Sequence, residues 1–320
     1  MDFSVVVMYL GFTLAAYSVV GNDTIQTLGT FLSSNERKKW WVLWLFAGGI
    51  LAGTLIYGYM THNGDVSYGR LAKYPMPDPF SWYYLLPPVI LMLLTRTGIP
   101  VSTSFLILTF FNEKNLNSMV IKSLSGYGVA FVAAIMLYLA ISRLVERKFI
   151  ERPITDKEEK IWTILQWCST GFLWSQWLIQ DFANIYVYLP RELDIYSLIF
   201  SLVVILGLLA YIIASKGGAI QSIIKSKTNT VDIRSATIID FVYGIVLFYF
   251  KELNNVPMST TWVFLGILAG REIALNYMLR KNEPRAKMFK SLGIDLVKVV
   301  IGLVVSIVLV FAVKFLATSI

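Results

Sequence analysis

Two short segments each combine an aspartate with amide side chains in otherwise apolar surroundings. Asp23 and Asp181 are both preceded by an amide residue and followed, three residues later, by a second amide. Carboxylate and amide oxygens are hard ligands that suit a small cation. The segments therefore predict a cation site, with the two aspartates as candidate sodium ligands, although the residue types fit a proton as well. The predicted cation-binding residues are Asn22, Asp23, Gln26, Gln180, Asp181 and Asn184.

A second reading of Asp23 is that it caps a helix that begins after Gly21. An ionised aspartate at the centre of a membrane helix costs about 2.5–3.5 kcal/mol, so one retained there usually faces an ion, a partner or a polar cavity. The equivalence of Asp23 and Asp181 favours the cation site over the cap.

Downstream of each aspartate, a proline is followed closely by three hydroxyl residues. Proline is favoured at the start of a helix, where the first backbone N–H groups have no partner within the helix. Those donors and the positive end of the helix dipole attract anions without a lysine. The same residues could instead act as simple caps. The predicted anion-binding residues are Ser102, Thr103 and Ser104 after Pro100, and Ser259, Thr260 and Thr261 after Pro257.

The two pairs of motifs recur at nearly equal spacing. Asp23 and Pro100 are 77 residues apart, and Asp181 and Pro257 are 76 residues apart. The apolar stretches around them follow the same offset. The chain is therefore predicted to consist of two repeats, residues 1–158, which include a charged linker at 146–158, and residues 159–320.

Composition predicts a membrane protein. Of the 320 residues, 56% are hydrophobic and only 15% are charged, and the mean hydropathy is +0.64. Apolar stretches, several of them near the roughly 20 residues that a membrane-spanning helix needs, recur along the whole length. The predicted fold is an all-α polytopic membrane protein in a lipid bilayer, with short or broken helices at the central site.

The distribution of basic residues predicts the topology. The net charge is +8, but the basic residues gather in four connections, around residues 37–39, 143–160, 216–234 and 280–290. The positive-inside rule assigns these connections to the cytoplasm. If every apolar element crosses the membrane, both termini lie outside. Equivalent loops of the two repeats then lie on opposite sides of the membrane. The two repeats, of about five elements each, are therefore predicted to be inverted. Basic patches of this kind do not predict binding to nucleic acid, which needs an extended basic face.

Inverted repeats are an architecture of secondary transporters, in which two similar halves alternate around a site at their interface. A channel or a transport-inactive scaffold remains open. The sequence offers no nucleophile with a base and no metal cluster, so it predicts neither an enzyme nor a cofactor beyond the coupling ion.

The motifs resemble the duplicated signature of the inorganic phosphate transporter family, the sodium- or proton-coupled phosphate permeases. The matching segments are Gly21 to Gln26 with Pro100 to Phe105, and Gln180 to Asn184 with Pro257 to Trp262. Phe105 and Trp262 stand where the family motif has histidine. The resemblance implies a carrier of inorganic phosphate in the plasma membrane, with outside termini, cations at the Asp motifs and phosphate at the Ser-Thr helix starts. It also raises the expectation of a homodimer, and sulfate is the nearest alternative substrate.

Overall fold

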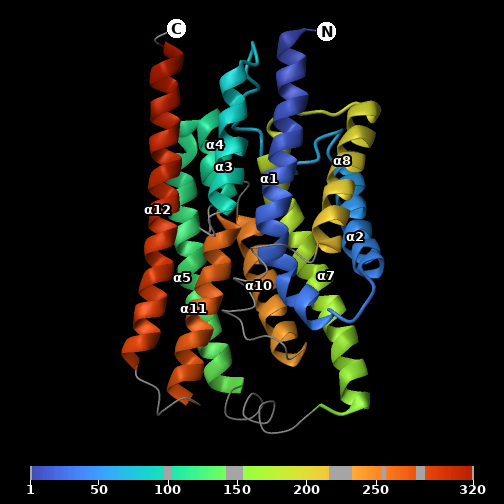
Figure 1. Ribbon diagram of the computed structural model, residues 1–320, viewed down its shortest axis with the longest axis vertical. Helices are drawn as coiled ribbons and strands as arrows, with labels where there is room; N and C mark the ends of the chain where they lie inside the picture. The colour runs from blue at the N-terminus through green and yellow to red at the C-terminus, as the bar shows by residue number, and fades with distance from the viewer. Residues whose placement is uncertain are drawn as a thin grey trace.

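The computed structural model describes residues 2–96, 102–141, 154–215, 233–253, 257–278 and 285–318. Over these ranges the chain forms helices joined by loops, with no strand. Five of the described helices are long and apolar enough to cross a membrane. The predicted all-α polytopic membrane fold is therefore confirmed (Figure 1).

Six long helices form the frame of the molecule. They are α1 (Phe3–Ser34), α2 (Trp40–Thr61), α5 (Leu116–Ile141), α7 (Asp156–Tyr186), α8 (Ile195–Ala214) and α12 (Arg285–Thr318). Local sequence sets several of their starts. Thr155 and Glu158 form a capping box at the start of α7, and Asp194 accepts hydrogen bonds from the amides of Tyr196 and Ser197 at the start of α8. Such caps satisfy N–H groups that have no partner within the helix.

Between α2 and α5 the chain forms shorter elements. They are η1 (Trp82–Leu85), α3 (Leu86–Arg96), α4 (Thr103–Phe111) and η2 (Glu113–Asn115). With 11 residues in α3 and 9 in α4, these helices are roughly 17 and 14 Å long, about half the thickness of the hydrocarbon core. Figure 1 shows both in the upper part of the molecule.

α3 and α4 contact each other. The predicted topology counted each short element as one crossing, but each of these two helices is too short to span the hydrocarbon core by itself. The predicted repeat would pair α3 and α4 with α10 (Ile233–Leu253) and α11 (Thr260–Met278). These two helices are longer, with 21 and 19 residues, and Figure 1 shows them in the lower part.

The helix packing follows a paired pattern. The contact of α5 with α11 is matched by that of α12 with α4, and the contact of α7 with α10 is matched by that of α1 with α3. In the same way, α1 contacts α8 and α7 contacts α2. In addition, α1 packs against α7 and α2 against α8. The half-length helices are thus held against long ones, and α1 and α7, which carry the two aspartate motifs, are in direct contact.

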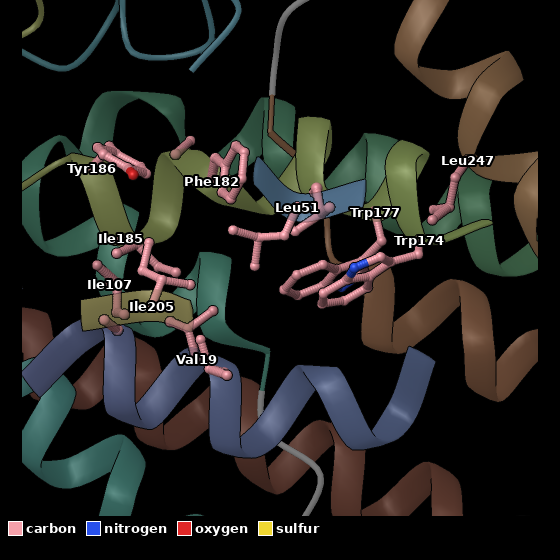
Figure 2. Packing of buried hydrophobic residues seen from close by; sticks show 14 of the residues in the cluster. Val19, Leu51, Ile107, Trp174, Trp177, Phe182, Ile185, Tyr186, Ile205 and Leu247 are labelled. Carbon is pink, nitrogen blue, oxygen red and sulfur yellow. The ribbon is translucent and has the colours of Figure 1, made fainter. Parts of the chain in front are cut away.

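Aromatic side chains fill much of the interior between these helices. Trp174 and Trp177 of α7 stack with ring centroids 4.8 Å apart and planes 4° apart (Figure 2). The indole N–H of Trp174 donates to the carbonyl of Ala47 in α2 at 2.9 Å. Because a buried indole normally needs an acceptor, this bond fixes α7 against α2.

Many large apolar side chains lie on the outer surface of the bundle. Large hydrophobic side chains such as Leu45, Val203 and Phe311 are more than half exposed, as expected of groups that face lipid. Figure 1 shows both termini at the upper end and the α1–α2 connection, with its basic residues 37–39, at the lower end.

The loop of residues 62–81 is closely packed at the upper end. Gly64 has a φ of +89°, and its carbonyl accepts a hydrogen bond from the Leu193 amide at 3.1 Å. A Cβ at Gly64 would lie 3.1 Å from backbone atoms of Leu193, so this position needs glycine. Arg191 ties the same loops together through two hydrogen bonds to the carbonyl of Tyr74. The loop is therefore fixed against the segment that follows α7.

Candidate functional site

Asp23 lies inside α1 and not at its start. The helix runs from Phe3 to Ser34 without a break at Gly21, so the reading of Asp23 as a helix cap is wrong. Asp23 is 1% exposed and Asp181 is fully buried. The two carboxylates are close enough to interact electrostatically. The two motifs, far apart in sequence, therefore meet in the interior.

A chain of hydrogen bonds joins the two aspartates. The hydroxyl of Thr103 donates to Asp23 Oδ2 at 2.8 Å. The amide of Asn184 donates to Thr103 Oγ1 at 3.0 Å and to Asp181 Oδ1 at 2.6 Å. Asn22 donates to Asp23 Oδ1 at 2.6 Å. Thr103 thus links α1 and α7 through the tip of α4.

The Ser-Thr segments form the starts of α4 and α11. The hydroxyl of Ser102 accepts a hydrogen bond from the Phe105 amide, and the hydroxyl of Ser259 accepts one from the Trp262 amide, both at 3.3 Å. These serines are N-caps, so the capping role is real. Each helix start has two further backbone amides that donate no hydrogen bond to a described residue. They belong to Thr103 and Ser104 in α4, and to Thr260 and Thr261 in α11. Capping therefore leaves donors for a ligand. Pro100 lies outside the described residues.

The two helix starts approach each other. Ser104 donates to the carbonyl of Met258, just before α11, at 3.2 Å, and its hydroxyl lies 3.4 Å from Asp181 Oδ1. The rings of Phe105 and Trp262 pack with centroids 5.4 Å apart. The predicted cation and anion motifs consequently form one continuous site.

Several buried oxygens near this site make no hydrogen bond to a residue that the structure describes. They are Asp181 Oδ2, Asn184 Oδ1, Gln180 Oε1, and the hydroxyl oxygens of Thr24 and Thr27. A buried polar group without a partner costs about 1–3 kcal/mol. Oxygen atoms of this kind are the ligands that alkali and alkaline-earth cations prefer. The donor set around Asp181 and Asn184 therefore fits a sodium ion.

The predicted residues do not all join this network. Gln26 and Thr261 are buried, 8% and 2% exposed, but their side chains make no hydrogen bond within the described part of the chain. Gln180 donates to the carbonyl of Leu247 in α10 at 3.2 Å. Thr260 lies beside Asp181, and its carbonyl accepts a hydrogen bond from the Tyr243 hydroxyl at 3.0 Å.

Two buried ionisable residues were missed in the sequence. Arg70, in the loop after α2, is 2% exposed and interacts electrostatically with Asp181. Asp240 in α10 is 1% exposed and accepts hydrogen bonds from Thr30 at 2.6 Å and from Thr170 at 2.5 Å. A lone acid within an apolar stretch is a signal that could have revealed Asp240; nothing in the sequence marks Arg70.

Thr170→Val tests how far the fold depends on the Asp240 contacts. The variant keeps the shape of the side chain but removes the donor to Asp240 Oδ2, so it should destabilise the protein by about 1–3 kcal/mol. Thermal unfolding of the purified protein measures this loss. Thr163→Val is the matched control, because that hydroxyl donates only to the Glu159 carbonyl of its own helix. Equal melting temperatures for the two variants would contradict the expectation.

The fold and the site together define a polytopic helical membrane protein with paired carboxylates and two helix starts at its centre. A solved structure described as a sodium-dependent phosphate transporter has the same fold, with a TM-score of 0.63 over 98% of this chain and 100% of that chain. The sequence identity is 15%, so the likeness concerns the fold alone. No protein-family model matches the sequence, and no curated protein matches it significantly.

Proposed function

We propose that this protein is a secondary active transporter that moves inorganic phosphate across the membrane together with a cation, sodium in preference to the proton. The observation that carries the proposal is the linkage of Asp23 and Asp181 through Thr103 and Asn184. The solved sodium-dependent phosphate transporter with the same fold supports the same substrate and cation.

The cation is bound at the two aspartates. Asp181 Oδ2 and Asn184 Oδ1 are buried acceptors without a donor, and a sodium ion would satisfy both. On α1, the carboxylate of Asp23 and the amide of Asn22 correspond to those of Asp181 and Asn184. Without bound cations, two carboxylates this close to the helix starts would repel an anion.

The anion is bound at the starts of α4 and α11. The amides of Thr103, Ser104, Thr260 and Thr261 donate to no described residue and offer four donors. A tetrahedral oxyanion has enough acceptors to use donors from both helices. Two like unit charges ~5 Å apart repel by roughly 3 kcal/mol at an effective dielectric constant of ~20. Cation binding at the carboxylates removes that repulsion, which makes binding of the anion depend on the cation.

Transport then requires the site to open to alternate sides. The paired packing pattern, α5–α11 with α4–α12 and α7–α10 with α1–α3, supports two structurally related halves, residues 1–158 and 159–320. We infer that these halves are inverted in the membrane and move relative to each other. Thr103 bonds to both α1 and α7, so its hydrogen bonds are expected to break in each cycle.

Uptake by the purified protein in proteoliposomes tests this function. We expect saturable uptake of radiolabelled phosphate that is driven by an inward sodium gradient, inhibited by arsenate, and weaker under a proton gradient alone. Stronger inhibition by sulfate than by arsenate would identify another oxyanion as the substrate. Non-saturable flux would indicate a channel, and no flux through folded protein would indicate a transport-inactive scaffold.

A further inference from the structure

Asp240 is a buried acid that the proposed function does not use. It lies in α10 and is 1% exposed. Its Oδ1 lies 2.6 Å from the hydroxyl oxygen of Thr30 in α1, and its Oδ2 lies 2.5 Å from the hydroxyl oxygen of Thr170 in α7. Within the described part of the chain, these two hydroxyls are the polar partners of the carboxyl group. Asp240 therefore joins three helices at one point.

This bridge is separate from the paired aspartates. Thr30 follows Asp23 by seven residues, and Thr170 precedes Asp181 by eleven. At 1.5 Å per residue, the bridge lies roughly 10 Å from Asp23 along α1 and roughly 16 Å from Asp181 along α7. Because α1 begins at the upper end of the molecule and runs downward (Figure 1), Asp240 lies below the proposed cation site.

No basic side chain is paired with Asp240 among the residues that the structure describes. α10 packs against α1, α5, α7 and α11. One turn beyond Asp240, the hydroxyl of Tyr243 donates to the carbonyl of Thr260. The buried charged side chains described in these five helices, none of which bonds to Asp240, are Asp23, Lys122, Asp181, Arg234 and Arg271. A buried carboxylate without a partner charge is very costly, and such a group is usually found neutral.

The two partners of Asp240 are those that a neutral carboxylic acid needs. A neutral acid has one O–H donor and one carbonyl oxygen, and a threonine hydroxyl can either donate or accept. One threonine can therefore donate to the carbonyl oxygen while the other accepts the acid O–H. The accepting threonine can turn its own hydrogen toward a carbonyl of the preceding helical turn. Both oxygens of Asp240 are bonded in this way, whereas Asp181 Oδ2 makes no hydrogen bond to a described residue.

We propose that Asp240 is a proton-binding site, in which the acid keeps its proton at neutral pH and bridges Thr30 and Thr170 as a neutral group. This inference goes beyond the proposed function, because it holds whichever oxyanion the protein carries. The protein then binds two kinds of cation at different depths, a sodium ion at the paired aspartates and a proton at Asp240. The bound proton keeps an unbalanced charge out of the point where α1, α7 and α10 meet.

The competing role for Asp240 is that of an ionised ligand for a second sodium ion. The two roles predict opposite results for Asp240→Asn. The amide of asparagine has both a donor and an acceptor, so it reproduces the hydrogen bonds of a neutral acid. It also removes the negative charge that an ionised ligand would supply. A proton site therefore tolerates this substitution, and a sodium site does not.

Infrared spectroscopy of the purified full-length protein in saturating sodium tests for the proton directly. A neutral carboxylic acid has a C=O stretching band that shifts in heavy water and that an ionised carboxylate lacks. We expect wild type to show this band at neutral pH and Asp240→Asn to lose it. Sodium affinity and sodium-driven uptake should stay close to wild type in Asp240→Asn. Asp156→Asn, which alters an exposed acid of α7, is the control and should keep the band.

Thr30→Val is a second variant, because it removes one hydrogen-bond partner and leaves the acid in place. It should keep the band but change its frequency, while Thr163→Val, which removes a hydroxyl that donates to the Glu159 carbonyl, should leave the frequency unchanged. A band of equal intensity in wild type and Asp240→Asn, or loss of sodium binding in Asp240→Asn, would overturn the proton site.

If Asp240→Asn does not fold, Thr30→Val decides, since an unaltered band in that variant means that the proton lies elsewhere. The proposed function is tested separately. A wild-type protein that takes up neither phosphate nor sulfate would contradict that function, and the infrared result would still hold for Asp240.

Discussion

Asp181→Asn is expected to abolish sodium-driven phosphate uptake in proteoliposomes, and Asp23→Asn should do the same. Each substitution keeps the size of the side chain and removes one negative charge from a fully enclosed site. In Asp181→Asn, an amide N–H₂ group also replaces one of two acceptor oxygens, and Oδ2 is the atom available for a cation. Loss of a residue that only orients a metal ligand typically weakens metal binding 10- to 100-fold. Loss of a charged ligand itself should therefore weaken sodium binding by on the order of 100-fold or more.

The measurement is the initial rate of uptake at a fixed sodium gradient, together with sodium affinity in detergent. Asp156→Asn is the control, since Asp156 is an exposed acid in the first turn of α7, the same helix as Asp181. It should transport at close to the wild-type rate. Wild-type uptake by Asp181→Asn or Asp23→Asn would exclude that carboxylate from cation coupling.

Gly270→Leu should prevent the protein from folding. α5 and α11 approach closely, and a Cβ at Gly270 would collide with the carbonyl oxygen of Phe131 and lie 2.9 Å from Ala134 Cβ. One turn earlier, a Cβ at Gly266 would lie 2.6 Å from the carbonyl oxygen of Tyr127. Small residues four apart allow this kind of approach between membrane helices. Because the obstacle is backbone, relaxation is limited, and the cost should exceed the ~1–3 kcal/mol usual for an overpacked core.

The yield of monodisperse protein on size-exclusion chromatography, and its melting temperature, measure this effect. Gly128→Leu is the control, because Gly128 also lies in α5 but a Cβ there meets nothing within 4 Å. That variant should remain within about 0.5 kcal/mol of wild type. A Gly270→Leu protein as stable as Gly128→Leu would mean that the α5–α11 contact is looser than the structure indicates.

Composition and repeated spacing were enough to predict the class of fold and the meeting of distant motifs. The apolar stretches predicted the membrane helices, because helix length in a bilayer is set by its thickness. The equal spacing of the Asp and Pro-Ser-Thr segments predicted that they act together, and Asp23, Thr103, Asn184 and Asp181 lie in one hydrogen-bonded chain.

What the sequence could not predict depends on tertiary contacts. Gly21 and Asn22 suggested a helix boundary, but α1 continues past them because the surrounding helices bury that turn. Arg70 reaches Ile179 across 109 residues of sequence, and no local pattern marks such a contact. Gln26 has the same spacing from its aspartate as Asn184 has, yet only Asn184 bonds to its aspartate, because the direction of a longer side chain is decided by packing.

The packed rings of Phe105 and Trp262 have a consequence for how the protein responds to acidity. The related motif has an imidazole at these positions, and imidazole changes its charge between about pH 5 and 8. Neither an indole nor a phenyl ring can do so, and His62, the single histidine, is exposed in a loop. In the proposed function, the side chains that follow the two Ser-Thr helix starts therefore add no group that titrates over the physiological range. An acid sensitivity of the proposed transport would then originate in the phosphate itself or in buried ionisable groups elsewhere in the protein.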